Sequence, residues 1–166
     1  MYNICTFLER VIKILNIKIK IVYWKIKYGK RIKVGKNLRF RKRFSLNISK
    51  EGYVEIGDNV FFNDDCSINC HEKIVIGNNC KFGQGVLFFD HDHDLKKENI
   101  SNELKYITEP VVIGNNCWVG ASNMLLRGTT IKDNCIIGAG CILKKTIERN
   151  SIYIQKREDE IRSYKE

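Results

Sequence analysis

Residues 111–143 read VVIGNNCWVGASNMLLRGTTIKDNCIIGAGCIL, and an aliphatic side chain recurs there at every sixth position. The six residues are Ile113, Val119, Leu125, Ile131, Ile137 and Leu143. The same period runs through 34–46 and 56–74 and, after a two-residue slip, through 76–88. Three such six-residue faces make a triangular coil of about 18 residues, whose aliphatic side chains point to the axis. The repeat therefore predicts an all-β protein, a parallel β-helix.

Small residues occupy a second fixed position, two residues before each aliphatic side chain. Five of the seven cysteines stand there: Cys66, Cys80, Cys117, Cys135 and Cys141. Free cysteine behaves as a small buried hydrophobic residue, so we interpret these five as unpaired core residues. An odd number of cysteines without a signal peptide favours a reducing cytoplasm, and the lack of zinc-finger spacing predicts no metal.

The net charge of +10 is confined to the first third of the chain. Residues 1–50 hold 15 lysines and arginines and one acid, Glu9, whereas the remaining 116 residues hold 14 bases and 18 acids. A body with a negative net charge is not expected to bind nucleic acid. Within a basic amphipathic segment at 1–30, the apolar spacing fits a helix up to Leu15 and a strand from Ile17 to Ile21. Residues 1–50 are expected to contact an anionic membrane at its cytoplasmic face, to close the open end of the β-helix, or to do both.

The six-residue pattern stops between Phe88 and Pro110, so we expect an extruded loop at 89–109 within a β-helix spanning 31–150, followed by a tail at 151–166. Loops of this length are often functional. This one opens with His91 and His93, two of the three histidines in the chain. Counting along the coil places His71 on His91, one coil away and about 5 Å apart. Such a pair could bind a metal, line an acceptor pocket or face solvent.

The segments IGNNCWVG (113–120) and IIGAGCILKK (136–145), together with the HDHD loop, resemble the left-handed β-helix acyltransferases. The resemblance is to the maltose, galactoside and capsular-polysaccharide O-acetyltransferase group and covers roughly residues 31–150. It implies a left-handed coil, a homotrimer with active sites between neighbouring subunits, and acetyl-CoA as co-substrate without a metal.

The resemblance also implies functional residues. A catalytic histidine lies ten residues after the position of Gly83, which gives His93, and the same register gives Asn63 and Trp118 as further active-site residues. Where some relatives carry an acceptor-binding aspartate, this chain has His71, so His71 and His91 are expected to bind substrate with Trp118. A neutral imidazole can remove the proton of an attacking hydroxyl, which makes His93 the expected general base.

The coenzyme would lie against small residues of the repeat and the lysines that follow them. By resemblance these are Trp118, Gly120, Ala121, Gly138, Ala139, Gly140, Lys144 and Lys145. A Gly-x-Pro element that usually closes the repeat in this group is missing from SIYIQKREDEIRSYKE, the end of the chain.

The function expected from these residues is direct acetyl transfer to a sugar hydroxyl of a surface polysaccharide or its precursor. The alternatives are N-acetylation of an amino sugar nucleotide and a non-catalytic trimeric scaffold at a membrane surface. The γ-type carbonic anhydrases share the fold but need three separated zinc-binding histidines, and His71, His91 and His93 have the wrong spacing.

Overall fold

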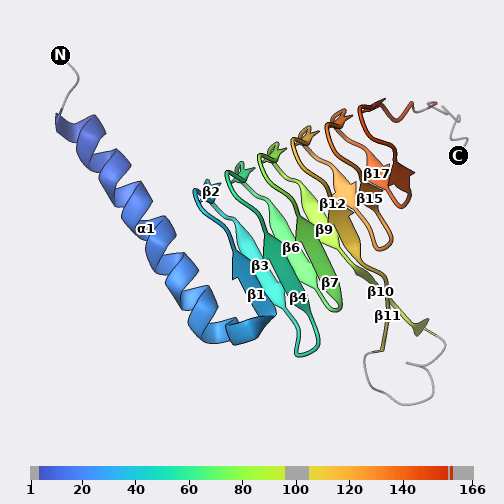
Figure 1. Ribbon diagram of the computed structural model, residues 1–166, viewed down its shortest axis with the longest axis horizontal. Helices are drawn as coiled ribbons and strands as arrows, with labels where there is room; N and C mark the ends of the chain where they lie inside the picture. Colours follow the sequence, from blue (N-terminus) through green and yellow to red (C-terminus); the bar gives the residue numbers. More distant parts are fainter. Residues whose placement is uncertain (1–3, 96–104, 157, 159–166) are drawn as a thin grey trace, which may run out of the picture.

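The computed structural model describes residues 4–95, 105–156 and 158, and it confirms a parallel β-helix (Figure 1). Three flat sheets form the faces of the coil, and within each sheet neighbouring strands are parallel. The left-handed sense of the coil comes from the resemblance and stays a prediction.

Each sheet takes one short strand from successive coils. Sheet A contains β1 (Ile32–Val34), β4 (Tyr53–Ile56), β7 (Lys73–Ile76), β12 (Val111–Ile113), β15 (Thr130–Ile131) and β18 (Thr146–Ile147). Sheet B contains β2 (Arg39–Phe40), β5 (Phe61–Phe62), β8 (Lys81–Phe82), β13 (Trp118–Val119), β16 (Ile136–Ile137) and β19 (Ile152–Tyr153). Sheet C contains β3 (Ser45–Ile48), β6 (Ser67–Cys70), β9 (Leu87–Phe89), β14 (Met124–Leu125) and β17 (Ile142–Leu143).

The coils differ in length, although a constant 18 residues was expected. Equivalent asparagines of successive coils lie 22, 20, 37, 18 and 16 residues apart. The first coils are longer because β3, β4, β6 and β7 have four residues each. The 37-residue step contains the extruded loop.

The predicted axis residues form the core. Phe62 and Phe82 stack with ring centroids 4.8 Å apart, and Ile113, Ile131 and Ile137 are each at most 1% exposed. All five cysteines of the small-residue position are buried and free, as predicted. Cys80, Cys117 and Cys135 directly precede strands of sheet B, whereas Cys66 and Cys141 precede strands of sheet C, so the five occupy two corners of the coil.

The coil turns at three corners. At the ladder corner, between sheets A and B, every coil carries an asparagine with φ between +56° and +59°: Asn37, Asn59, Asn79, Asn116, Asn134 and Asn150. Asparagine tolerates this left-handed conformation better than most residues. Each side-chain amide donates to the next coil's asparagine at 2.9–3.0 Å, so one ladder of hydrogen bonds joins all six coils.

The other two corners hold the predicted functional residues. The glycine corner, between sheets B and C, consists of residues 41–44, 63–66, 83–86, 120–123 and 138–141. The histidine corner, between sheet C and the next coil's sheet A, has a different turn in each coil. A β-hairpin leaves the third coil there, formed by β10 (His91–His93) and antiparallel β11 (Tyr106–Thr108). Residues 96–104 of the expected loop lie outside the described residues.

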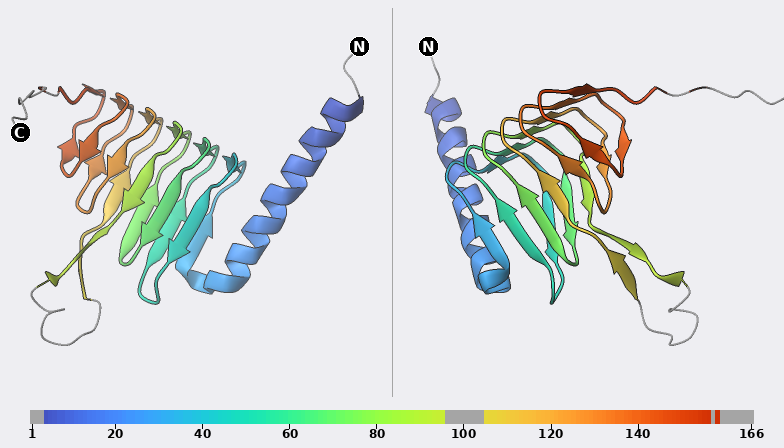
Figure 2. Two further views of the ribbon diagram at one scale, coloured as in Figure 1. Left: turned by 180° about the vertical axis from the view of Figure 1, so that it is seen from behind. Right: turned by 45° about the vertical axis from the view of Figure 1, so that its right-hand side comes forward.

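The N-terminal segment is one helix, α1 (Ile4–Tyr28), followed by the short 3-10 helix η1 (Gly29–Arg31). The strand alternative for residues 17–21 is therefore wrong. Trp24 and Tyr28 of α1 are buried against the first coil, and the Tyr28 hydroxyl donates to the Leu46 carbonyl oxygen at 2.8 Å. In both views of Figure 2, α1 lies at the first-coil end of the β-helix, opposite the last coil. Among the described helices, none is long and apolar enough to cross a membrane.

Candidate active site

Three histidines and a tyrosine form one cluster of rings at the histidine corner. The ring of His71, in the turn after β6, lies 4.0 Å from that of His91 and 4.0 Å from that of Tyr106. His93 lies 5.1 Å from Tyr106 on the same hairpin. The predicted stacking of His71 on His91 is confirmed, and β10 and β11 bring His93 to the same cluster.

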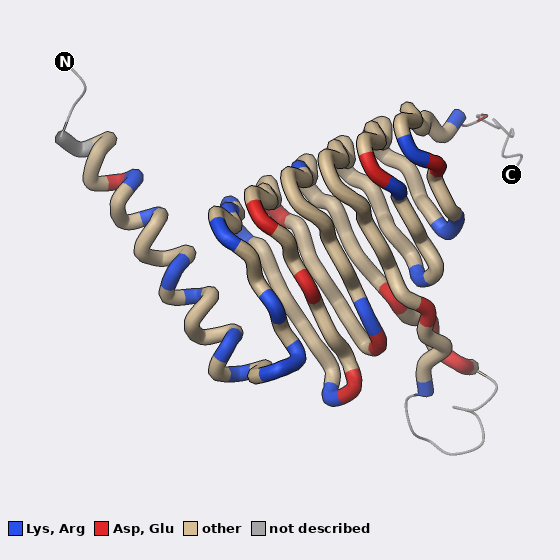
Figure 3. The backbone as a smooth tube through the Cα atoms, in the orientation of Figure 1, with Lys and Arg blue, Asp and Glu red and all other residues tan. Residues whose placement is uncertain are grey.

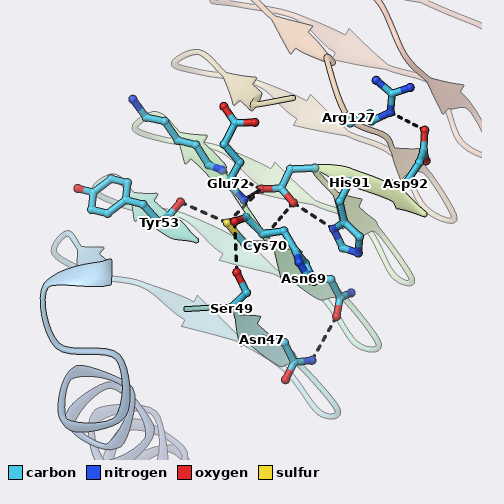
Figure 4. A network of polar contacts seen from close by, with 12 residues as sticks. Asn47, Ser49, Tyr53, Asn69, Cys70, Glu72, His91, Asp92 and Arg127 are labelled. Carbon is cyan, nitrogen blue, oxygen red and sulfur yellow. Dashed lines mark hydrogen bonds and ion pairs between the residues drawn. The ribbon is translucent and has the colours of Figure 1, made fainter. Parts of the chain in front are cut away.

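A buried carboxylate, Asp90, fixes this corner. It has no exposed surface, and its oxygens accept the backbone N–H groups of His71 at 2.7 Å, Glu72 at 2.8 Å and Lys73 at 2.8 Å. The Cys70 thiol also donates to it, at 3.2 Å, and burial together with this carboxylate raises the pKa of the thiol. Figure 4 shows these contacts around Cys70 and Glu72. Asp90 therefore ties the turn after β6 to the base of the hairpin.

Asp90 also orients His91. Its Oδ1 lies 3.1 Å from Nδ1 of His91, and an ionised carboxylate is only an acceptor. A hydrogen bond at this contact therefore requires Nδ1 of His91 to be the donor. Partial burial, together with the neighbouring His91, lowers the pKa of His71, which favours a neutral His71 ring.

The two histidines of the hairpin differ in exposure. The His91 side chain is 13% exposed, whereas His93 is exposed. A ligand arriving from solvent can therefore reach His93 directly, while His91 is held inside the corner.

A second ionic group holds the hairpin from its other side. Asp92 accepts from Nε of Arg127 (Figure 4). It also lies 3.3 Å from Nζ of Lys144, and these two contacts lower the pKa of Asp92. Arg127 lies 3.6 Å from Glu109, the residue that follows β11. Side chains of the fourth and fifth coils thus form ion pairs with acidic residues of both arms of the hairpin.

A groove begins at the histidines and runs along sheet C to the end of α1. It has a volume of about 330 Å³. Two asparagines from adjacent coils line it, with Asn47 donating to Asn69 at 3.2 Å. The complete lining is Lys27, Tyr28, Asn47, Ile48, Ser49, Asn69, Cys70, His71, Phe89 and His91. Amides, an aromatic ring and imidazoles suit a polar ligand with apolar faces, such as a sugar.

Asn63 and Trp118 do not join the histidine cluster in a single chain. Asn63 lies at the glycine corner, where its Oδ1 accepts the N–H of Asp64 at 2.9 Å. His71 lies beyond the other end of β6, whose four residues alone span on the order of 13 Å. Trp118 lies on the outer face of sheet B, 56% exposed, between Lys81 and Ile136 of the adjacent strands. One chain therefore supplies the predicted residues on separate faces.

The residues expected to contact coenzyme lie mostly in stacked turns of the glycine corner. Gly120 needs its small size, because a Cβ there would lie 2.8 Å from the backbone nitrogen of Ala139. At Gly138 the nearest atom, in Ile154, would be 3.4 Å away, so space remains. Gly140 has φ +70°, which favours glycine. The carbonyl oxygen of Ala121 accepts the Gly140 N–H at 2.8 Å.

The two lysines have partners within the chain. Lys144 is next to Asp92, and Lys145 lies over the Tyr153 ring at 5.6 Å. Within residues 4–95, 105–156 and 158, no group of three or more histidine, cysteine or acidic side chains could hold a metal ion.

Sequence reasoning missed Asp90, Asp92, Tyr106 and Arg127. Asp90 and Asp92 stand where the repeat breaks, and they alternate with the two histidines, which was the available signal. Tyr106 and Arg127 carried none, because their positions depend on the pairing of β10 with β11 and on the stacking of coils.

Comparison with known proteins gives a consistent group. The family model "Bacterial transferase hexapeptide (six repeats)" matches residues 110–145. The galactoside O-acetyltransferase of Escherichia coli is 32% identical over 125 residues, which are 75% of this chain and 50% of that enzyme. The E. coli protein WbbJ, named for O-acetyl transfer in lipopolysaccharide biosynthesis, is 25% identical over 166 residues, 91% of this chain and 85% of that protein. The chain thus spans half the length of the first relative.

Two solved structures have the same architecture. A maltose O-acetyltransferase from Clostridium difficile has a TM-score of 0.66 and 28% identity, covering 75% of this chain and 66% of that one. A galactoside acetyltransferase in complex with coenzyme A has a TM-score of 0.58 and 26% identity, covering 70% of this chain and 60% of that one.

Proposed function

This chain belongs to the hexapeptide-repeat transferases, and from that premise we propose that it transfers an acetyl group from acetyl-CoA to a hydroxyl of a surface-polysaccharide sugar or its precursor. The observation that carries the proposal is an imidazole cluster in which His71 and His91 line a groove with amides, while His93 adjoins them through the Tyr106 ring. The relatives named for galactoside and lipopolysaccharide O-acetylation support the choice of a sugar hydroxyl.

In the proposed reaction His93 is the general base. Its exposed imidazole takes the proton of the attacking hydroxyl while that oxygen bonds to the thioester carbonyl carbon. The tetrahedral intermediate then collapses, the carbon–sulfur bond breaks, and the proton passes from His93 to the coenzyme A thiolate. His91, held by Asp90, and His71 bind and orient the acceptor. Neither a metal nor a covalent acyl-enzyme is needed.

The separation of the predicted residues supports a site shared between subunits. In the proposed homotrimer, the glycine corner of one subunit faces the histidine corner of its neighbour. Asn63 then stabilises the acceptor or the developing negative charge, beside backbone N–H donors. Trp118 and the small residues Gly120, Ala121, Gly138, Ala139 and Gly140 accommodate coenzyme, and Lys144 and Lys145 attract its phosphates.

The proposed place of action is the cytoplasm, at the inner face of the membrane, where residues 1–50 contact anionic lipid. This fits an enzyme that modifies lipid-linked glycans, because the acceptor would lie at the same surface.

The test is coenzyme A release by the purified protein from acetyl-CoA, with a panel of oligosaccharides and amino sugar nucleotides. We expect release with an oligosaccharide and a product whose acetyl group is removed by mild alkali, as an ester is. An alkali-stable product on an amino sugar would instead establish N-acetylation. No release with any acceptor, from protein that binds acetyl-CoA, would favour the scaffold.

A further inference from the structure

The exposed side of α1 carries an unbroken apolar stripe. Successive helix residues are about 100° apart, and eight large apolar side chains recur at three- and four-residue intervals on the side away from the β-helix. Each of the eight is between 36% and 78% exposed: Leu8, Val11, Ile12, Leu15, Ile19, Val22, Tyr23 and Ile26. We call this set the outer stripe.

The side of α1 that packs on the β-helix is a different one. Trp24 and Tyr28 are 5% exposed, and Ile17 and Ile21 are partly buried. These four residues lie on the opposite side of the helix from the outer stripe. The contact with the first coil is therefore made by another side of α1, and the outer stripe is a second, exposed apolar surface.

Lysines border the outer stripe on both sides. Lys18 and Lys25 follow one edge and Lys20 and Lys27 the other, and all four are exposed. Glu9 is the only acid in the helix (Figure 3). Exposed apolar residues between two rows of cations match the interface of a bilayer, where acyl chains lie beneath anionic headgroups.

We infer that α1 lies in the plane of a bilayer containing anionic lipids and inserts the outer stripe below the headgroups. Two other roles for the outer stripe fit less well: a contact with a second copy of α1 and a helix that crosses the membrane. A second copy of α1 would bring lysines against lysines along both edges, which is repulsive. A helix crossing the membrane would have to bury those lysines, and α1 is not apolar enough for that. The inference does not depend on the acetyl-transfer activity.

The experiment is cosedimentation of the full chain with vesicles of phosphatidylcholine alone or of phosphatidylcholine with phosphatidylglycerol. The variant Ile19→Asn/Ile26→Asn removes two of the most exposed stripe residues, 65% and 78% exposed. Its matched control is Ile152→Asn/Ile154→Asn, which changes two isoleucines that are each 70% exposed on the last coil. Circular dichroism and the thermal midpoint check that both variants fold.

We expect the wild-type chain to bind anionic vesicles, with weaker binding at high salt, and the stripe variant to bind at least about tenfold less tightly. The control pair should bind as the wild type does. A third variant, Lys18→Glu/Lys25→Glu, should lose the preference for anionic vesicles while keeping the stripe.

Three results would overturn the inference. The first is that the wild-type chain binds neither kind of vesicle, and the second is that the control pair loses as much binding as the stripe pair. The third is a stripe variant that forms a smaller assembly in analytical ultracentrifugation but binds vesicles as the wild type does, which would make the outer stripe a contact between copies.

Discussion

The ladder corner and the histidine corner close the same coils by opposite means. At the ladder corner every coil uses the same left-handed asparagine, and each turn is stabilised by the equivalent residue of the next coil. At the histidine corner no two turns are alike, and one buried carboxylate, Asp90, secures the irregular junction. The identical turns of the ladder corner support the fold. The irregular turns of the histidine corner are where the histidine and aspartate side chains cluster.

The largest expected difference between the two corners comes from removing the proposed general base, His93. His93→Ala should lower kcat by about 10² to 10⁴ and leave stability almost unchanged, because His93 is exposed. His91→Ala should reduce kcat less. Initial rates of coenzyme A release and thermal midpoints measure both quantities. A larger loss for His91→Ala would make His91 the base, with Asp90 as its orienting group.

Asp90→Ala should produce the largest loss of stability at the histidine corner. It removes a buried acceptor that three partly buried backbone N–H groups share, at a cost of about 3–4 kcal/mol in the free energy of unfolding. Asp90→Asn keeps one oxygen acceptor and should lose less. Urea denaturation gives both values, and a negligible effect of Asp90→Ala would show that the junction is held elsewhere.

Asn79→Ala tests the ladder corner. The substitution removes two side-chain hydrogen bonds of 3.0 Å and places alanine at φ +59°, which together should cost about 2–3 kcal/mol. Asn79→Gly loses the same bonds without the backbone strain and should be about 1 kcal/mol more stable than Asn79→Ala. The folded variants should keep wild-type kcat, because Asn79 is remote from the histidines along the coil.

The smallest effect concerns protonation of His71. Burial lowers its pKa in the folded state, so below the ordinary histidine value the unfolded chain binds more protons and stability falls. His71→Gln should flatten that part of the profile between about pH 7 and about pH 5, while leaving stability at higher pH nearly unchanged. Denaturant midpoints across this range provide the measurement. An unchanged pH profile would mean that other groups dominate.

The repeating part of the β-helix was predictable because the position of a residue in the six-residue repeat determines its role. The axis positions such as Ile131 and Ile137 and the small residues such as Cys135 follow from spacing alone, and they are buried as expected. The stacking of His71 on His91 followed from the same count of residues per coil.

The rest depends on contacts distant in sequence. The alternation of lysine and isoleucine in residues 17–21 resembled a strand, yet those residues are helical because Ile17, Ile21, Trp24 and Tyr28 share one helix face against the first coil. The contact of Arg127 with Asp92 joins residues 35 positions apart, and neither residue type predicts its partner from the sequence. The separation of Asn63 from the histidines likewise could not be predicted from the sequence, because it depends on which corner of the coil each residue occupies.

The inserted hairpin also affects the loop-closure free energy of the chain. Ile74 pairs with Val111 across the inserted segment, whereas Ile113 pairs with Ile131 one ordinary coil later, yet both pairs keep the parallel register of sheet A. Lengthening the connection from 18 to 37 residues roughly doubles the loop to be closed, which adds only about 0.6 kcal/mol to the loop-closure free energy. A corner of this β-helix can therefore gain an inserted hairpin for less free energy than one well-formed hydrogen bond contributes.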